Sequence, residues 1–241
     1  MKFEIVTLFP DYFAQPLRQS LLGKAIDNKL FEIEIINLRA FAEDRHHTVD
    51  DRPFGGGGGM VLMIEPIDRC LQKLGYPRRS DGPIDNGSRI VLTSAAGETF
   101  GQPKAIEYSL GERLTIICGH YLGVDDRLIQ LYDIDEVSLG DFILSGGEPV
   151  AMSLIDAIAR LIPGVMGNFE SAMDDSHMEG LLGAPCYTRP AEYEGLAVPE
   201  VLLSGDHKAI EQFRQRQAIE KSKEVRPDLL KAGDQDEEED E

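Results

Sequence analysis

The sequence predicts an α/β protein whose parallel sheet is covered by helices on both faces. Short apolar runs alternate with segments of helical periodicity, and several of these runs are apolar throughout. Parallel strands need helical crossovers and are buried on both sides, so this alternation is typical of them. At 241 residues the chain is long enough to bury a substantial core without disulfides or metals.

The expected elements follow one another along the first two thirds of the chain. Strands are expected at residues 2–9, 31–38, 89–93, 114–118 and 136–139. Helices are expected from Pro10 through Leu21, and then at residues 65–74, 102–110, 125–132 and 153–162. Residues 43–60 and 76–88 show no periodicity, so we expect a long loop and a surface excursion.

Composition divides the chain into an α/β domain at residues 1–163, a linker at 164–186, a small helical domain at 187–231 and a tail at 232–241. Asp206 is a good N-cap for a long helix in the small domain, where Ile210, Phe213 and Ile219 recur at helical spacing. Residues 234–241 carry seven acids and no base, which predicts a disordered, solvated tail.

The formal net charge of −19 counts against a nucleic-acid partner, yet the charge is unevenly placed. Residues 208–231 hold seven bases and four acids, and a second basic cluster consists of Arg39, Arg45, His46, His47 and Arg52. Three widely spaced cysteines form no disulfide framework, and no apolar run reaches the length of a membrane span. We therefore expect a cytoplasmic protein with two basic surfaces and no membrane association.

Three glycine-bearing loops, at residues 93–97, 118–123 and 139–147, each follow an expected strand. Ligands of parallel sheets sit beyond the carboxyl ends of the strands, so these loops should converge. Glycines let the backbone approach a ligand closely, and Phe142, Ile143 and Leu144 could wall a flat apolar group. The loops predict a pocket for a nucleoside cofactor, although a strand end and a turn would also explain residues 138–148.

Other polar residues have structural explanations that compete with chemical ones. His46, His47, Asp50 and Asp51 include metal-ligand types, but no third distal ligand is obvious, so a polar loop is favoured over a metal site. Arg160 stands near a helix end, where the dipole favours cations. Asp175 lies in an irregular stretch, where acids commonly cap turns.

Several blocks together resemble the bacterial tRNA (guanine-N1)-methyltransferases, a family of the SPOUT class with a trefoil knot. They include Leu8-Phe9-Pro10, Asp44-Arg-His-His-Thr-Val-Asp-Asp-Arg-Pro-Phe-Gly-Gly-Gly57, Cys118-Gly-His-Tyr121, Gly140-Asp-Phe-Ile-Leu-Ser-Gly-Gly-Glu148, Ser171-Ala-Met-Asp-Asp-Ser176 and Tyr187-Thr-Arg-Pro190. The resemblance runs from Phe3 to about Leu230. It implies a knotted catalytic domain, a helical tRNA-binding domain and a homodimer with a shared active site.

The resemblance also implies roles for particular residues. Methyl passes from S-adenosylmethionine to N1 of the guanosine at tRNA position 37, with Asp175 as general base and Arg160 stabilising O6. The residues expected to bind the cofactor are Ser94, Gly119, Tyr121, Leu139, Gly140, Asp141, Phe142, Ile143, Leu144, Gly146 and Gly147.

Leu122 departs from the family pattern, in which a Glu usually occupies this position. That Glu is linked to metal dependence, so no metal ligand is predicted and a Mg²⁺ requirement is left open. Two rival interpretations are a metal-dependent hydrolase built on His46, His47, Asp50 and Asp51, and a non-catalytic RNA-binding member of the same fold.

Overall fold

The computed structural model describes residues 1–85, 87–167, 175–178 and 180–230. The chain divides into two compact units, residues 1–167 and 168–241, and each is described by itself. The expected acidic tail at 232–241 and the linker segment 168–174, with Asp174, lie outside the described residues. None of the described helices is long and apolar enough to cross a membrane.

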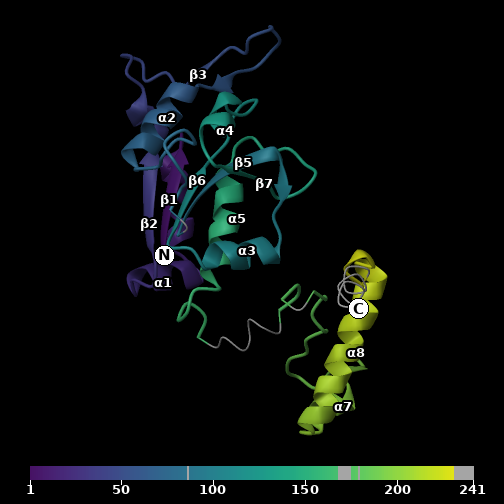
Figure 1. Ribbon diagram of the computed structural model, residues 1–241. Coiled ribbons are helices and arrows are strands. Elements are labelled where there is room, and N and C mark those ends of the chain that lie inside the picture. Colours follow the sequence, from purple (N-terminus) through teal and green to yellow (C-terminus); the bar gives the residue numbers. More distant parts are fainter. Residues whose placement is uncertain (86, 168–174, 179, 231–241) are drawn as a thin grey trace, which may run out of the picture. The chain divides into compact units, whose positions relative to one another are not determined.

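The first unit contains a five-stranded sheet in which every pair of neighbouring strands is parallel. Its strand order is β2-β1-β6-β5-β7, as Figure 1 shows. The strands are β1 (Lys2–Thr7), β2 (Glu32–Asn37), β5 (Ser88–Thr99), β6 (Arg113–Ile117) and β7 (Asp135–Ser138). The predicted α/β fold with a parallel central sheet is confirmed.

Helices follow most of these strands. They are η1 (Pro10–Phe13), η2 (Pro16–Arg18), α1 (Ser20–Asp27), η3 (Leu38–Phe41), α2 (Ile64–Lys73), α3 (Gln102–Ser109), α4 (Arg127–Leu131) and α5 (Glu148–Ala159). The single helix expected after Pro10 is instead three short ones, because a proline inside a helix removes a hydrogen bond and clashes with the preceding turn. Pro16 begins the second of them.

Two further boundaries differ from expectation. Helix α5 begins at Glu148 rather than near residue 153, with Pro149 in its first turn, where proline is well tolerated. The expected loop at 43–60 contains a short strand, β3 (Asp50–Asp51), which pairs antiparallel with β4 (Val61–Leu62).

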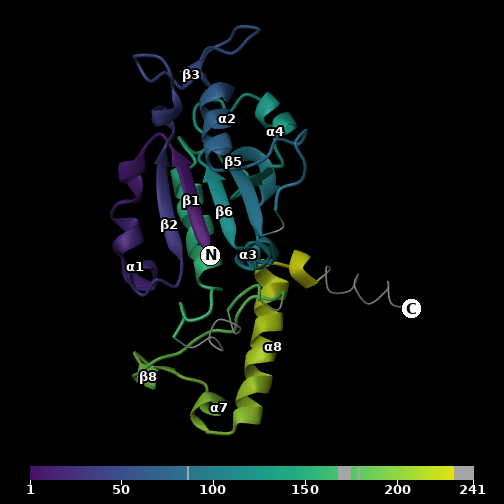
Figure 2. The same cartoon turned by 60° about the vertical axis from the view of Figure 1, so that its left-hand side comes forward.

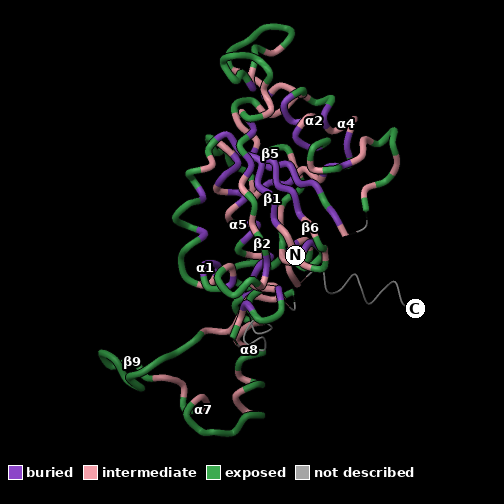
Figure 3. The backbone as a smooth tube through the Cα atoms, turned by 90° about the vertical axis from the view of Figure 1, so that its left-hand side faces the viewer, coloured by how far each residue is buried: buried purple, intermediate pink, exposed green. Residues whose placement is uncertain are grey.

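Alternating side chains of the strands point into two hydrophobic cores, one on each face of the sheet. Phe3, Val91 and Ile116 pack with residues of α1, α3 and α5. Ile90 and Ile117, with other residues, pack against α2 and α4 on the opposite face. The buried strands run through the middle of the unit in Figures 2 and 3. Coverage of both faces explains why Ile90, Val91 and Leu92 of β5 form an apolar run, whereas the edge strand β2 alternates Glu with Ile.

The second unit contains α7 (Glu200–Leu203), the longer helix α8 (His207–Val225) and a small ribbon of β8 (Glu192–Tyr193) and β9 (Leu196–Ala197). Asp206 caps α8, because its carboxylate accepts hydrogen bonds from the backbone N–H groups of Lys208 and Ala209, both at 3.1 Å. The buried Ser222 hydroxyl accepts a hydrogen bond from the Leu182 N–H at 2.9 Å, which holds an irregular segment against the helix.

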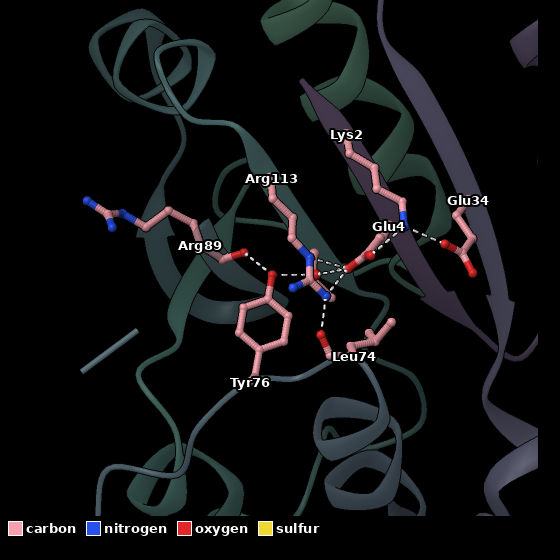
Figure 4. Close-up of polar contacts among 8 residues, drawn as sticks. Lys2, Glu4, Glu34, Leu74, Tyr76, Arg89 and Arg113 are labelled. Carbon is pink, nitrogen blue, oxygen red and sulfur yellow. Dashed lines mark hydrogen bonds and ion pairs between the residues drawn. The ribbon is translucent and has the colours of Figure 1, made fainter. Parts of the chain in front are cut away.

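A buried carboxylate joins the amino-terminal ends of the central strands (Figure 4). Glu4 on β1 is 2% exposed and accepts hydrogen bonds from the Thr115 hydroxyl at 2.7 Å, Arg113 Nε at 2.9 Å and Lys2 Nζ at 2.9 Å. Arg113 also donates to the Leu74 carbonyl at 2.7 Å, beyond the end of α2. Burial by itself would raise the pKa of Glu4, but these hydrogen bonds outweigh it and hold the pKa below its ordinary value of 4.5.

We expect Glu4→Gln to lower the free energy of unfolding by about 3 kcal/mol at neutral pH, because it leaves the half-buried Arg113 beside an uncharged partner. A carboxyl group whose pKa is depressed in the folded state stabilises above its unfolded pKa and loses that contribution as pH falls through its folded pKa. The difference between wild type and variant should therefore shrink as pH falls below 4.5, measured by urea denaturation at several pH values.

Glu34→Gln is the matched control, because Glu34 also pairs with Lys2 but its side chain is 52% exposed. This variant should unfold much as the wild type does. A stability difference for Glu4→Gln that stays constant from neutral to acidic pH would contradict the account.

Candidate functional site

A pocket with a volume of about 480 Å³ opens at the carboxyl ends of β5, β6 and β7. Its walls come from the three loops expected to converge there, at residues 92–96, 119–124 and 138–147. The predicted cofactor residues that line it are Ser94, Gly119, Tyr121, Leu139, Gly140, Phe142, Ile143, Leu144, Gly146 and Gly147. Asp141 is exposed and is not part of the lining that the structure describes.

The first loop is an excursion from within strand β5. Thr93 and Glu98 both pair with Val137 of β7, so residues 94–97 leave the sheet and return to the same partner. Gly97 closes this bulge against β7, because a Cβ there would lie 2.4 Å from the Val137 nitrogen. Bulges of this kind redirect side chains at the edge of a site.

The second and third loops touch through their backbones. The Gly147 N–H donates to the Gly119 carbonyl at 2.8 Å, and His120 forms an isolated antiparallel bridge with Gly146. A Cβ on Gly147 would lie 1.8 Å from Thr93 Oγ1 and 2.8 Å from the Gly119 nitrogen. Gly147 has an ordinary φ of −83°, so glycine is needed here for close approach rather than for conformation.

Helix α5 begins at this contact with a buried acid that sequence reasoning did not select as a site residue. Glu148 is 4% exposed, and its carboxylate accepts a hydrogen bond from the Thr7 hydroxyl of β1 at 2.7 Å. A negative charge in the first turn is favoured by the helix dipole. The sequence did contain a signal for this helix start, because an acidic residue between a glycine and a proline is typical of the first turn of a helix.

Cys118, under the second loop, has no nucleophilic role at this site. Burial, and then the nearby Glu148 carboxylate, raise the pKa of the Cys118 thiol well above its usual range. A thiol that stays protonated is neither a good nucleophile nor a metal ligand. The described lining of the pocket consists largely of glycine backbone and apolar side chains.

Large apolar side chains at the pocket are exposed to solvent. Tyr121, Leu122, Phe142, Ile143 and Leu144 range from 41% to 82% exposed. The imidazole ring of His120 lies beside them. Its centroid is 4.5 Å from that of the Tyr121 ring and 5.3 Å from that of the Phe9 ring. An exposed apolar cluster of this kind commonly marks a ligand site, and it suits a flat group such as a nucleobase.

The charged residues of the pocket are acidic. Asp126 and Glu136 belong to its lining, whereas no Lys or Arg is found among the described residues that line it. Phosphates are usually bound by cations or by helix amino termini, and helix α5, which begins at the pocket, carries the acidic Glu148 in its first turn. The lining therefore suits a neutral or positively charged nucleoside better than a nucleotide.

The loop that follows η3 is organised by the Asp44 carboxylate. The Asp44 carboxylate accepts from the backbone N–H groups of His46 and Thr48, each at 2.8 Å, and from the Thr48 hydroxyl at 2.9 Å. These bonds, chiefly that from the Thr48 backbone, hold the pKa of Asp44 below its ordinary value. Within the described ranges, no group of three or more His, Cys, Asp or Glu side chains could hold a metal ion.

The far end of the same loop joins the pocket. Leu122 donates from its N–H to the Met60 carbonyl at 3.0 Å, and Leu62 donates to the Gly123 carbonyl at 2.9 Å. Gly59 lies so close that a Cβ on it would be 3.0 Å from the Leu122 side chain. The loop that carries most of the basic cluster is thus joined to the pocket at its carboxyl-terminal end.

The two predicted catalytic residues lie in different units. Arg160 is the C-cap of α5 in the first unit, is half-buried, and donates from its N–H to the Asp156 carbonyl at 3.3 Å. Asp175 is exposed in the second unit, where its carbonyl accepts from the Met178 N–H at 3.3 Å.

The similarity of this chain to known proteins extends over both units. The chain matches the family model for tRNA (guanine-1)-methyltransferase TrmD over residues 1–232. It is 48% identical over 232 residues to the tRNA (guanine-N(1)-)-methyltransferase of Geotalea uraniireducens, covering 95% of this chain and 90% of the relative. The proteins of the same name from Dehalococcoides mccartyi (strain CBDB1) and Lactiplantibacillus plantarum are 45% and 46% identical. Both alignments cover 95% of this chain, with 90% and 91% of the relatives.

We expect Gly147→Ala to destabilise the first unit by about 2 kcal/mol or more, because its methyl group would overlap Thr93 and the backbone of Gly119. Gly58→Ala is the control, since nothing lies within 4 Å of a Cβ there. The control should shift stability by less than about 0.5 kcal/mol. Urea denaturation measures both, and a Gly147→Ala protein as stable as wild type would show that the loops are not packed this closely.

Proposed function

The chain belongs to the tRNA (guanine-1)-methyltransferase family, and from that premise we propose that it methylates N1 of the guanosine at tRNA position 37, using S-adenosylmethionine. The observation that carries the proposal is the pocket at the carboxyl ends of β5, β6 and β7. Its volume falls within the range of small-ligand sites. Its apolar walls, its backbone groups and its acids suit a nucleoside that carries a positive sulfonium, and they disfavour a phosphate.

The residues proposed to bind the donor are those of the three loops. Leu139 through Leu144, with Gly146 and Gly147, would come from the third loop, and Ser94, Gly119 and Tyr121 from the first two. When bound, the donor supplies an electrophilic methyl group, and the protein's task is alignment. Asp141 is exposed, so we propose that it contacts the donor through its backbone rather than its side chain.

The proposed chemistry of the acceptor needs a base and a cation. N1 of guanine carries a proton at neutral pH, so its lone pair is available only after that proton leaves. The Asp175 carboxylate takes the proton, as a general base. Negative charge then develops on O6, where the Arg160 guanidinium stabilises it through two hydrogen-bond donors.

The length of α5 supports a homodimer with a shared active site. The helix begins at the pocket with Glu148 and has twelve residues before Arg160. Twelve residues of α-helix span about 18 Å, which is longer than an extended arginine side chain. This separation between Arg160 and the start of α5 supports our proposal that each reaction centre combines residues of two subunits.

We also propose a knotted fold, two basic regions that bind tRNA, and a reaction in the cytoplasm. Membership of the family supports a trefoil knot, and we propose that knot here. The basic cluster on the 43–60 loop and the basic helix α8 would bind tRNA phosphates. The reaction would take place in the cytoplasm, where tRNA is found.

Methyl transfer to unmodified tRNA tests the function directly. We expect 1-methylguanosine to form in transcripts with guanosine at position 37, detected by mass spectrometry of the digested nucleosides. A transcript with adenosine at 37 is the control and should take up no methyl group. A second pair, with and without guanosine at position 36, tests sequence preference. Binding of tRNA without methylation would favour a non-catalytic member of the fold and overturn the proposal.

We expect Asp175→Asn to lower the single-turnover rate by about a hundredfold or more, because the amide cannot accept the N1 proton. Arg160→Ala should slow the same step while the affinity for S-adenosylmethionine changes little. Single-turnover kinetics and calorimetric binding of the donor separate the two effects. An Asp175→Asn rate equal to wild type would refute the base, and a loss of donor affinity alone would refute the role of Arg160.

A further inference from the structure

Thr93 stands where the first pocket loop leaves strand β5. It is the last residue of β5 to pair with Val137 before the 94–97 excursion, and only 5% of its surface is exposed. Its side chain is therefore enclosed at the base of the pocket rather than at the mouth. A buried hydroxyl in such a position needs hydrogen-bond partners.

The Thr93 hydroxyl finds these partners on the neighbouring strand and its loop. Its oxygen accepts a hydrogen bond from the Gly119 N–H at 2.9 Å, and the hydroxyl donates to the Ile117 carbonyl at 3.4 Å. The Thr93 carbonyl is close as well, since a Cβ on Gly119 would lie 2.4 Å from it. The first and second loops are thus joined through one side chain.

The third loop packs on the same hydroxyl. A Cβ on Gly147 would lie 1.8 Å from Thr93 Oγ1, so the hydroxyl fills the space that a side chain at Gly147 would need. The Gly147 N–H also donates to the Gly119 carbonyl at 2.8 Å. All three loops of the pocket therefore meet at Thr93, which comes from one loop and contacts the backbone of the other two.

We infer that Thr93 is a positioning residue of the methyl-donor pocket, whose hydroxyl sets the spacing of the Gly119 and Gly147 backbones. The identity of the ligand rests on the proposed function, whereas the contacts of Thr93 do not. A pocket that binds through backbone groups depends on their placement to within a fraction of an ångström. Thr93 thus acts on the ligand through Gly119 and Gly147, without being required to touch it.

A second buried threonine provides a matched control. Thr115 on β6 is 0% exposed, and its hydroxyl donates to Glu4 of β1, toward the amino-terminal ends of the strands and away from the pocket. Removing either hydroxyl leaves a buried polar group without its partner and should lower stability. Only Thr93 is joined to the pocket loops, so only its removal should alter donor binding.

The test compares Thr93→Val, which keeps the shape and loses the hydroxyl, with Thr93→Ser, which keeps the hydroxyl. We expect calorimetry with S-adenosylmethionine to show a dissociation constant about tenfold higher for Thr93→Val and within about twofold of wild type for Thr93→Ser. Thr115→Val should melt at a lower temperature yet bind with unchanged affinity. Thr93→Ala, which also lacks the hydroxyl but cannot crowd the loops, replaces Thr93→Val if that variant fails to fold.

Amide hydrogen exchange adds a readout that needs no ligand. The Gly119 amide should exchange faster in Thr93→Val than in wild type, and at the wild-type rate in Thr93→Ser and Thr115→Val. Wild-type affinity and wild-type Gly119 exchange in Thr93→Val would overturn the inference. If wild-type protein did not bind S-adenosylmethionine, the proposed function would fail, while Gly119 exchange would still decide the role of Thr93.

Discussion

Close backbone contact between Gly119 and Gly147 is the constraint on which the rest of the site depends. The N–H of one glycine donates to the carbonyl of the other at 2.8 Å, and neither residue has room for a Cβ. This contact brings the chain after β6 against the start of α5, although Gly119 and Gly147 are 28 positions apart in the sequence. The pocket walls, the buried Glu148 and the direction of α5 all follow from that meeting point.

The two ends of the sheet are held by different chemistry. At the amino-terminal ends of the strands, the buried Glu4 is neutralised by Arg113 and Lys2, which contributes to stability. At the carboxyl-terminal ends, the Thr93 hydroxyl and the glycine backbones pack together beside the buried Glu148.

Much of the fold could be predicted because alternating periodicity is a local property of the sequence. The strands and the three pocket loops were predicted in this way. Pro16 was a local signal for the break of the first helix that the prediction overlooked, whereas the bulge in β5 depends on pairing with β7. Thr93 and Glu148 were missed because their partners, Gly119 and Thr7, lie 26 and 141 residues away. The roles of Arg160 and Asp175 come from family resemblance and stay predictions, since the two residues belong to separate units.

Hydrogen exchange of the wild-type protein, with and without S-adenosylmethionine, tests most directly whether the three joined loops form the donor site. The account predicts that the ligand slows exchange in residues 94–97, 119–123 and 139–147 together, because one ligand would contact all three. The edge strand β2 and the helix α2 should exchange as before. Protection confined to other segments, or no change in these three loops at saturating ligand, would contradict the central claim.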